Sequence, residues 1–209
     1  MTPTKATLAT RSVLDVSELP DTAFGPRDLV WWGTLGFIVI EGFTLALCAV
    51  VYIYLMQNAI EWPPRGTPLP AIGVPTLQVA AMVLSLPLVA WLGRVALRCD
   101  LARTRIALTI LTPVCALLVA LRFVELTRSL NVRWDTNAYG SAQWLVVVTH
   151  GTLLLFQFVE VTGVAVAFWF AELEQKHFSD AADVAFYWYF MVLAWIPLYV
   201  LCFLLPRWV

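Results

Sequence analysis

Long hydrophobic runs, separated by short polar segments, dominate the chain. Five of these runs reach the roughly 20 residues that an α-helix needs to cross a ~30 Å hydrocarbon core. Each is too long for a β-strand and lacks strict alternation, so helices are favoured over a membrane barrel. The pattern therefore predicts an all-α, polytopic membrane protein with transmembrane helices at residues 29–57, 75–97, 106–127, 142–170 and 184–205.

The first 27 residues contrast with the rest because they are polar and punctuated by prolines. They lack the apolar core of 7–15 residues that marks a secretory signal peptide. We therefore divide the chain into a polar N-terminal tail at residues 1–27 and a five-helix membrane domain at residues 28–209.

Composition supports lipid as the solvent of this domain. The chain is 61% hydrophobic and 13% charged, whereas about a quarter of the residues in a soluble domain are charged. The net charge of −1 provides no basic field for nucleic acid. The cysteines are Cys48, Cys99, Cys115 and Cys202. None of them forms a CxxC or CxxH pair, so neither a metal site nor a disulfide framework is indicated.

The distribution of lysine and arginine predicts the orientation in the membrane. Residues 94–105, where the second predicted helix leads into the third, hold four arginines, and placing them in the cytoplasm puts eight basic residues on that side and four on the other. The positive-inside rule then predicts the N-terminus inside and the C-terminus outside. The loop with Trp62-Pro63-Pro64 faces outward, and we expect Trp62 at the membrane–water interface, where tryptophan is enriched.

Apart from Arg94 at the end of the second span, five charged or histidine side chains fall within the predicted spans: Glu41, Arg122, Glu125, His150 and Glu160. A charge at the bilayer centre costs roughly 2.5–3.5 kcal/mol, so these residues are candidates for polar intramembrane or lipid contacts. Glu41 lies near the middle of the first span without a visible cationic neighbour, which favours its neutral form. Two interpretations remain open: a proton or lipid site, or a neutral acid hydrogen-bonded to another helix.

Arg122 and Glu125 are spaced i, i+3 and can therefore pair on one helical face. We place them near the outer end of the third span, where long side chains reach the interface at low cost. A structural ion pair is favoured over a functional site.

His150 and Glu160 share the fourth span, but their separation of ten residues places them roughly 80° apart around the helix axis. We do not expect them to form one site by themselves. Neither belongs to an HExxH or ExxH motif, so a di-metal bundle is not indicated. Only one of the two histidines lies in a span, which argues against bound haem. The sequence thus shows no catalytic, cofactor-binding or metal-ligating set.

Four short motifs follow one another along the chain. The first is Glu41, followed after its helix by Trp62-Pro63-Pro64-Arg65-Gly66, and the second is Glu125. The third is the segment NAYGS with Tyr139 and Gly140, followed by His150-Gly151, and the fourth contains His177, Phe178, Tyr187, Trp188, Trp195 and Tyr199. In these motifs and their order, the chain resembles subunit III of the haem–copper respiratory oxidases, in the five-helix bacterial form. The resemblance covers nearly everything from Trp31 to Trp208.

The resemblance implies a non-catalytic accessory subunit of the bacterial cytoplasmic membrane. Such a subunit packs against catalytic subunit I, in a complex with subunit II, and the haems and copper belong to those partners. It also implies a cleft that holds phospholipid, and a role in stability and proton uptake during aerobic electron transport. Gly36, Gly163 and Ala165 would let helices or a partner approach closely.

Three residues depart from the family pattern. Leu153 stands where the family usually has a second histidine, and Tyr189 and Val192 replace a histidine and an aspartate in the last helix. These departures keep open an accessory subunit of a nitric oxide reductase on the same fold. A small transporter or proton channel is a weaker alternative, because five scattered polar groups do not line a continuous path and no repeat is visible.

Overall fold

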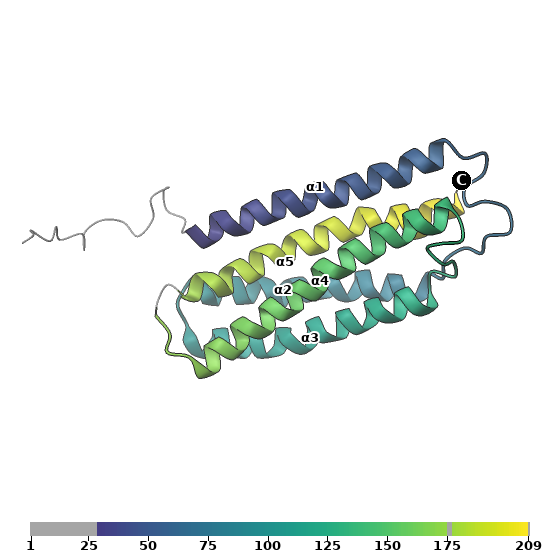
Figure 1. The fold of residues 1–209 in the computed structure, drawn as a ribbon. Coiled ribbons are helices and arrows are strands. Elements are labelled where there is room, and N and C mark those ends of the chain that lie inside the picture. The colour runs from purple at the N-terminus through teal and green to yellow at the C-terminus, as the bar shows by residue number, and fades with distance from the viewer. Residues whose placement is uncertain (1–28, 175–176, 209) are drawn as a thin grey trace, which may run out of the picture.

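The computed structural model describes residues 29–174 and 177–208, which form an antiparallel helical bundle (Figure 1). Each of its five long helices is apolar enough to cross a membrane, so this prediction is confirmed for the described part of the chain. The predicted tail at residues 1–27 lies outside the described residues. The helices are α1 (Leu29–Gln57), α2 (Gly73–Ala96), α3 (Leu101–Arg128), α4 (Ala138–Phe170) and α5 (His177–Tyr199), and α5 continues through a π-helical turn (Val200–Leu204) and a 3₁₀ turn (Leu205–Arg207).

Three helices begin at least four residues earlier than the apolar runs predict: α3, α4 and α5. The capping residues explain two of these differences. Asp100 Oδ1 accepts a hydrogen bond from the Arg103 amide at 3.1 Å, and Asn137 Oδ1 accepts one from the Gly140 amide at 2.8 Å. Such side chains satisfy the free N–H groups of a first helical turn. Because these first turns are polar, the extent of the apolar run does not reveal them.

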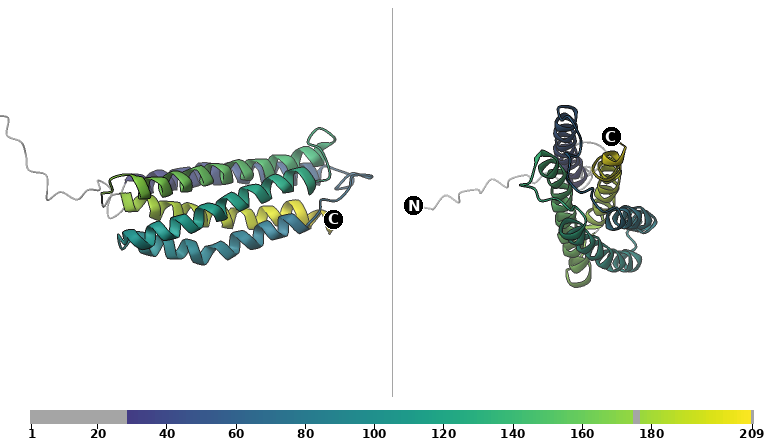
Figure 2. Two further views of the ribbon diagram at one scale, coloured as in Figure 1. Left: turned by 90° about the horizontal axis from the view of Figure 1, so that it is seen from below. Right: turned by 90° about the vertical axis from the view of Figure 1, so that its right-hand side faces the viewer.

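Four of the helices form a ring, and the fifth lies outside it. Helix α2 packs on α3, α3 on α4, α4 on α5, and α5 returns to α2. Helix α1 packs mainly against α4 and α5, as the end-on view in Figure 2 shows. In the most apolar stretch of α1 17% of the residues are buried, against 44% in that of α5. Most of α1 is therefore left for lipid or another chain to cover.

Aromatic side chains of α5 fill the centre of the ring. Trp188 and Trp195 are both almost completely buried. The Trp188 indole N–H donates to Ser85 Oγ at 2.8 Å, and the Ser85 hydroxyl donates to the Met82 carbonyl at 2.6 Å. A buried indole N–H usually finds such a partner. This contact ties α5 to α2 inside the apolar core.

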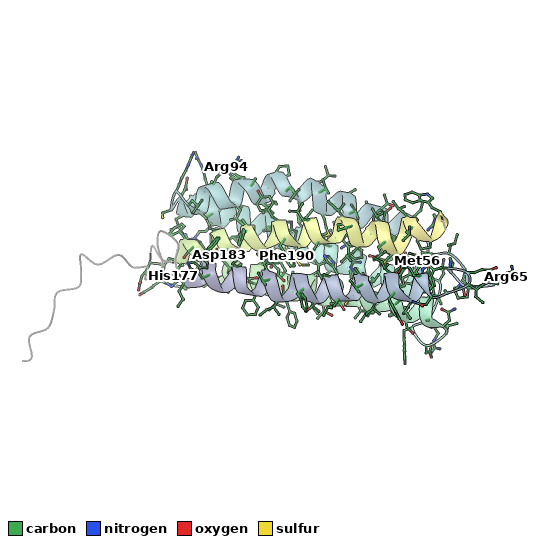
Figure 3. The ribbon with its side chains drawn as sticks, turned by 90° about the horizontal axis from the view of Figure 1, so that it is seen from above. Met56, Arg65, Arg94, His177, Asp183 and Phe190 are labelled. Atoms are coloured by element: carbon green, nitrogen blue, oxygen red, sulfur yellow. The ribbon has the colours of Figure 1, made fainter. Side chains whose placement is uncertain are left out.

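The loop between α1 and α2 is fastened to the neighbouring end of the bundle. Figure 3 shows Arg65 at this end and both Arg94 and His177 at the opposite end. The loop is held by backbone and side-chain hydrogen bonds to the segment between α3 and α4: Ala71 N–H to Ser129 O at 2.7 Å, Asn131 Nδ2 to Leu69 O at 2.8 Å, and Asn137 Nδ2 to Thr67 Oγ1 at 2.9 Å.

Trp62 does not face the membrane interface, so that prediction is wrong. Its side chain is 5% exposed and packs edge-on against Tyr52 and Tyr139, with ring centroids 5.3 and 5.1 Å away. Its indole N–H donates to Tyr52 Oη at 3.1 Å. Because the loop folds back over the bundle end, the Trp62-Pro63-Pro64 segment packs against the core; the Trp62–Pro63 peptide bond is cis.

The glycines of α1 and α4 fall into two groups. A Cβ added at Gly36 or Gly163 would meet nothing within 4 Å, so the close helix approach expected there does not occur within this chain. A Cβ at Gly151 would instead lie 3.0 Å from Arg122 Cγ, and one at Gly140 would collide with the Arg133 carbonyl. Close approach is therefore needed at the glycines of the third motif.

Candidate functional site

The candidate residues within the spans separate into two groups in space. The buried ionic cluster consists of Arg122, Glu125, His150 and Trp195 and lies inside the ring of α2 to α5. The acidic pocket is a cavity of about 420 Å³ between α1, α4 and α5. It is lined by Thr34, Phe37, Glu41, Phe156, Gln157, Glu160 and Tyr187.

An ion pair forms the centre of the buried ionic cluster. Arg122 Nη1 lies 2.7 Å from Glu125 Oε2, as the i, i+3 spacing predicts. The two residues are 3% and 0% exposed, however, so the expectation that they reach toward the interface is wrong. Their face of α3 is turned into the ring, where the pair is shielded from both lipid and water.

His150 of α4 provides a second partner for the Arg122 guanidinium, whose Nε has no hydrogen-bond partner among the described residues. Arg122 Nη2 lies 3.1 Å from His150 Nδ1, and His150 Nε2 lies 3.2 Å from the Met191 carbonyl of α5. A guanidinium only donates and a carbonyl only accepts. These partners therefore assign the proton to Nε2 and leave Nδ1 as the acceptor, which makes His150 a neutral link between α3 and α5.

Trp195 and Gly151 close the cluster. The Trp195 ring stacks on His150 with centroids 4.5 Å apart, and Arg122 Cζ lies 3.8 Å from the Trp195 ring centroid, within range of a cation–π interaction. Gly151 leaves the space through which the Arg122 side chain crosses α4. One positive group, one negative group and one neutral imidazole are thus packed together across three helices. This arrangement serves to lock the bundle.

The acidic pocket arises from matching faces of its helices. Thr34, Phe37 and Glu41 follow the i, i+3, i+7 spacing of one helical face. Glu160 lies one turn beyond Phe156 on α4, so its side chain enters the same cavity. His150 points instead into the buried ionic cluster. His150 and Glu160 therefore belong to different sites, as their spacing along the helix predicts.

Tyr187 of α5 provides a hydrogen bond to Glu41 of α1. The Tyr187 hydroxyl donates to Glu41 Oε2. Of the two interpretations left open for Glu41, the hydrogen bond to another helix is therefore seen directly. Glu41 also faces the cavity, so the second interpretation remains a hypothesis.

Sequence reasoning missed Gln157 as a member of this pocket. It is 1% exposed, and neither its amide oxygen nor its amide nitrogen has a hydrogen-bond partner among the described residues. The sequence does contain a signal for it: Gln157 is a polar amide within an apolar helix, three residues before Glu160 and therefore on the same helical face.

The carboxylates of the pocket have no cationic partner within the described parts of the chain. The ion pairs found there are Arg65–Glu61, Arg103–Asp100, Arg122–Glu125 and Arg133–Asp135. None involves Glu41 or Glu160. The pocket therefore presents two acidic side chains without a basic partner among the described residues, and the Tyr187 phenol donates a hydrogen bond to one of them, Glu41.

An apolar groove of about 430 Å³ lies beside the pocket, between α1 and α5. Gly42, Ala46 and Ala49 form its α1 wall, and Phe190 and Pro197 contribute from α5. Figure 3 shows Phe190 between these two helices. Its lining contains no charged side chain, so it suits hydrocarbon.

The other motif residues pack or terminate helices. Tyr139 and Trp62 pack together at one end of the bundle. His177 begins α5, and its Nδ1 accepts from the Glu174 amide at 2.8 Å. Residues 29–174 and 177–208 contain no group of three His, Cys, Asp or Glu side chains placed to hold a metal ion.

No model of a known protein family matches the sequence, and no curated protein matches it.

Proposed function

We propose that the chain is subunit III of a haem–copper terminal oxidase, a non-catalytic accessory subunit in a bacterial cytoplasmic membrane. One observation carries the proposal: residues from three of the four motifs meet in the buried ionic cluster. Glu125 comes from the second motif, His150 and Gly151 from the third, and Trp195 from the fourth. Short motifs that occurred by chance would have no reason to share one set of contacts.

The exposed surface of α1 supports a role in a larger complex. This helix leaves most of its apolar residues uncovered, and Gly36 lies on a face with nothing within 4 Å of its Cβ position. Subunit I, together with subunit II, would cover part of that surface and would carry the haems and copper. Small residues at such a face allow close packing of a partner helix.

The proposed lipid cleft corresponds best to the apolar groove between α1 and α5. Its apolar lining suits acyl chains, and arginines at the helix ends could bind phosphate groups. The count of eight basic residues against four supports the N-terminus inside and the C-terminus outside. Reporter fusions at each end would test this orientation.

Copurification tests the proposal directly. The full-length chain, tagged and extracted in mild detergent, should bring with it a large multi-helix subunit whose haem gives a Soret band. Mass spectrometry would identify that partner. Recovery without any haem-containing chain, or a stoichiometric Soret band in the separated chain alone, would contradict the accessory role.

The nitric oxide reductase alternative has one supporting observation. In α5, Val192 is buried and Tyr189 lies at the surface, so neither position offers the polar groups usual in the oxidase family. Oxygen consumption and nitric oxide consumption by the purified complex would separate the two partners. Reduction of nitric oxide without oxygen reduction would favour the alternative.

A further inference from the structure

The Tyr187–Glu41 hydrogen bond joins α1 to α5, but the packing role proposed above does not account for Glu160 or for the cavity of the acidic pocket. Glu41 and Glu160 come from different helices, face one cavity and interact electrostatically. No lysine, arginine or histidine among the described residues pairs with either carboxylate. Two like charges in a membrane are costly unless a cation or protons compensate them. Protons or a bound cation can provide this compensation, and the cavity that both side chains line leaves room for a cation.

Gln157 gives an independent indication that the pocket takes a ligand. Buried polar side chains nearly always have hydrogen-bond partners. Gln157 is 1% exposed and lines the cavity, yet neither end of its amide is satisfied within the described residues. Both amide atoms are enclosed, so an internal water, or a ligand group that moves the neighbouring side chains aside, would satisfy this amide.

The size of the cavity separates an inorganic ion from an organic one. A water molecule takes up roughly 30 Å³ of liquid volume, and small-molecule sites span roughly 300–1,000 Å³. The pocket, at about 420 Å³, belongs to the second class. Two aromatic rings, Phe37 at 63% and Phe156 at 65% exposure, stand at its margin. Aromatic faces attract organic cations.

The depth of the pocket further restricts the ligand. Glu41 lies about 18 Å along α1 from Leu29, and Glu160 about 15 Å along α4 from Phe170, at 1.5 Å per residue. Half of the hydrocarbon core is about 15 Å thick. Both carboxylates therefore lie several turns inside long apolar helices, and we expect a ligand there to be lipid-soluble. The amine of a phospholipid headgroup stays closer to the interface.

We propose that the acidic pocket binds a lipophilic organic cation, such as a quaternary ammonium or phosphonium. The Glu41 and Glu160 carboxylates balance its charge, and Phe37 and Phe156 contact its apolar body. Gln157 provides a hydrogen-bonding group at the buried wall. This site goes beyond the accessory role and does not depend on the identity of the catalytic partner.

Binding of tetraphenylphosphonium to the full-length chain tests the site. The protein is reconstituted in phosphatidylglycerol nanodiscs, which contain no amine headgroups, and saturable binding of the labelled cation is measured against empty nanodiscs. We expect Glu160→Gln to raise the Kd at least tenfold and the Glu41→Gln/Glu160→Gln double variant to abolish saturable binding. Glu61→Gln, in the exposed loop, is the matched control and should leave the Kd unchanged.

Competition identifies the chemistry of the ligand. Tetraphenylborate has nearly the same shape with the opposite charge and should not displace the probe. Unchanged binding in the double variant, with normal far-UV circular dichroism, would overturn the proposal. Displacement by millimolar Ca²⁺ would identify an inorganic-cation site, and displacement by added phosphatidylethanolamine would identify a headgroup site; either result would also overturn it. None of these outcomes affects the copurification test.

Discussion

The two polar groups within the bundle differ in how their charges are balanced. In the buried ionic cluster, Arg122 is matched by Glu125, and His150 links the pair to α5. In the acidic pocket, Glu41 and Glu160 face a cavity with a phenol as the one hydrogen-bonding partner in the described residues. The comparison teaches that a buried acid with a basic partner serves the structure, whereas an acid without one is a candidate for ligand binding. The number of ionisable groups matters less than this pairing.

The positions of the helices explain this difference. The cluster draws its residues from α3, α4 and α5, which belong to the closed ring, so packing shields it on all sides. The pocket includes a wall from α1, which packs outside the ring. A peripheral helix leaves space for a cavity. The predictions below test whether each group behaves as its surroundings indicate.

The largest effect is expected for Glu125→Ala. It leaves the Arg122 charge buried and unpaired, which should destabilise the protein by about 3–5 kcal/mol. Unfolding in mixed detergent micelles, followed by far-UV circular dichroism, measures the change. The Arg122→Met/Glu125→Leu double variant should recover most of the loss, since apolar replacement of a buried pair is often neutral. If stability is not recovered, Arg122 and Glu125 contribute more than the mutual neutralisation of their charges.

A smaller loss is expected for Gly151→Ala. The new Cβ would lie 3.0 Å from Arg122 Cγ and force the side chain aside, at a cost of about 1–3 kcal/mol as for other overpacked cores. Gly163→Ala on the same helix is the control. Its Cβ meets nothing within 4 Å, so the variant should be neutral or gain about 0.5–1 kcal/mol from higher helix propensity. Equal effects at both glycines would contradict the proposed path of Arg122.

Tyr187→Phe should lower the stability of the protein slightly, because it removes a hydrogen bond in the acidic pocket. The variant removes the hydroxyl that donates to Glu41 but keeps the ring, so a loss of about 1 kcal/mol is expected for one hydrogen bond. Tyr54→Phe, on the exposed face of α1, is the control and should change nothing measurable. The same unfolding titration reports both. A loss as large as that of Glu125→Ala would show that Glu41 belongs to a closed network.

The smallest effect is expected for Glu160→Gln. Glu160 is exposed and has no ion pair in the described residues, so the unfolding free energy should change by no more than about 0.5 kcal/mol. The variant would then weaken cation binding without loss of stability, as expected for a ligand-binding group. A strong destabilisation would place Glu160 with the structural acids.

The sequence predicts the helices well because membrane thickness demands long apolar runs. It also predicts the Arg122–Glu125 pair, since i, i+3 neighbours are close on any helix. It does not predict where that pair points. Hydropathy estimates depth along the membrane normal, whereas the contact with His150 depends on how α3 is rotated against α4.

The same limit explains Trp62 and Gln157. The position of Trp62 in the chain predicts a place at the interface, but its loop folds back and packs the ring against Tyr52 and Tyr139. Gln157 gains its importance from a cavity to which α1 contributes, and no local pattern encodes that cavity. The family resemblance and the catalytic partner stay predictions until copurification tests them.

The position of α1 also bears on how the protein is assembled in the cell. Helices emerge from the ribosome in chain order, so α1 enters the membrane before its main partners, α4 and α5, are made. It must remain in the bilayer as an isolated helix while most of the chain is translated. The long apolar stretch of α1 favours its stable insertion in the bilayer before those partners are made. Closure of both the groove and the acidic pocket is therefore a late event in biogenesis.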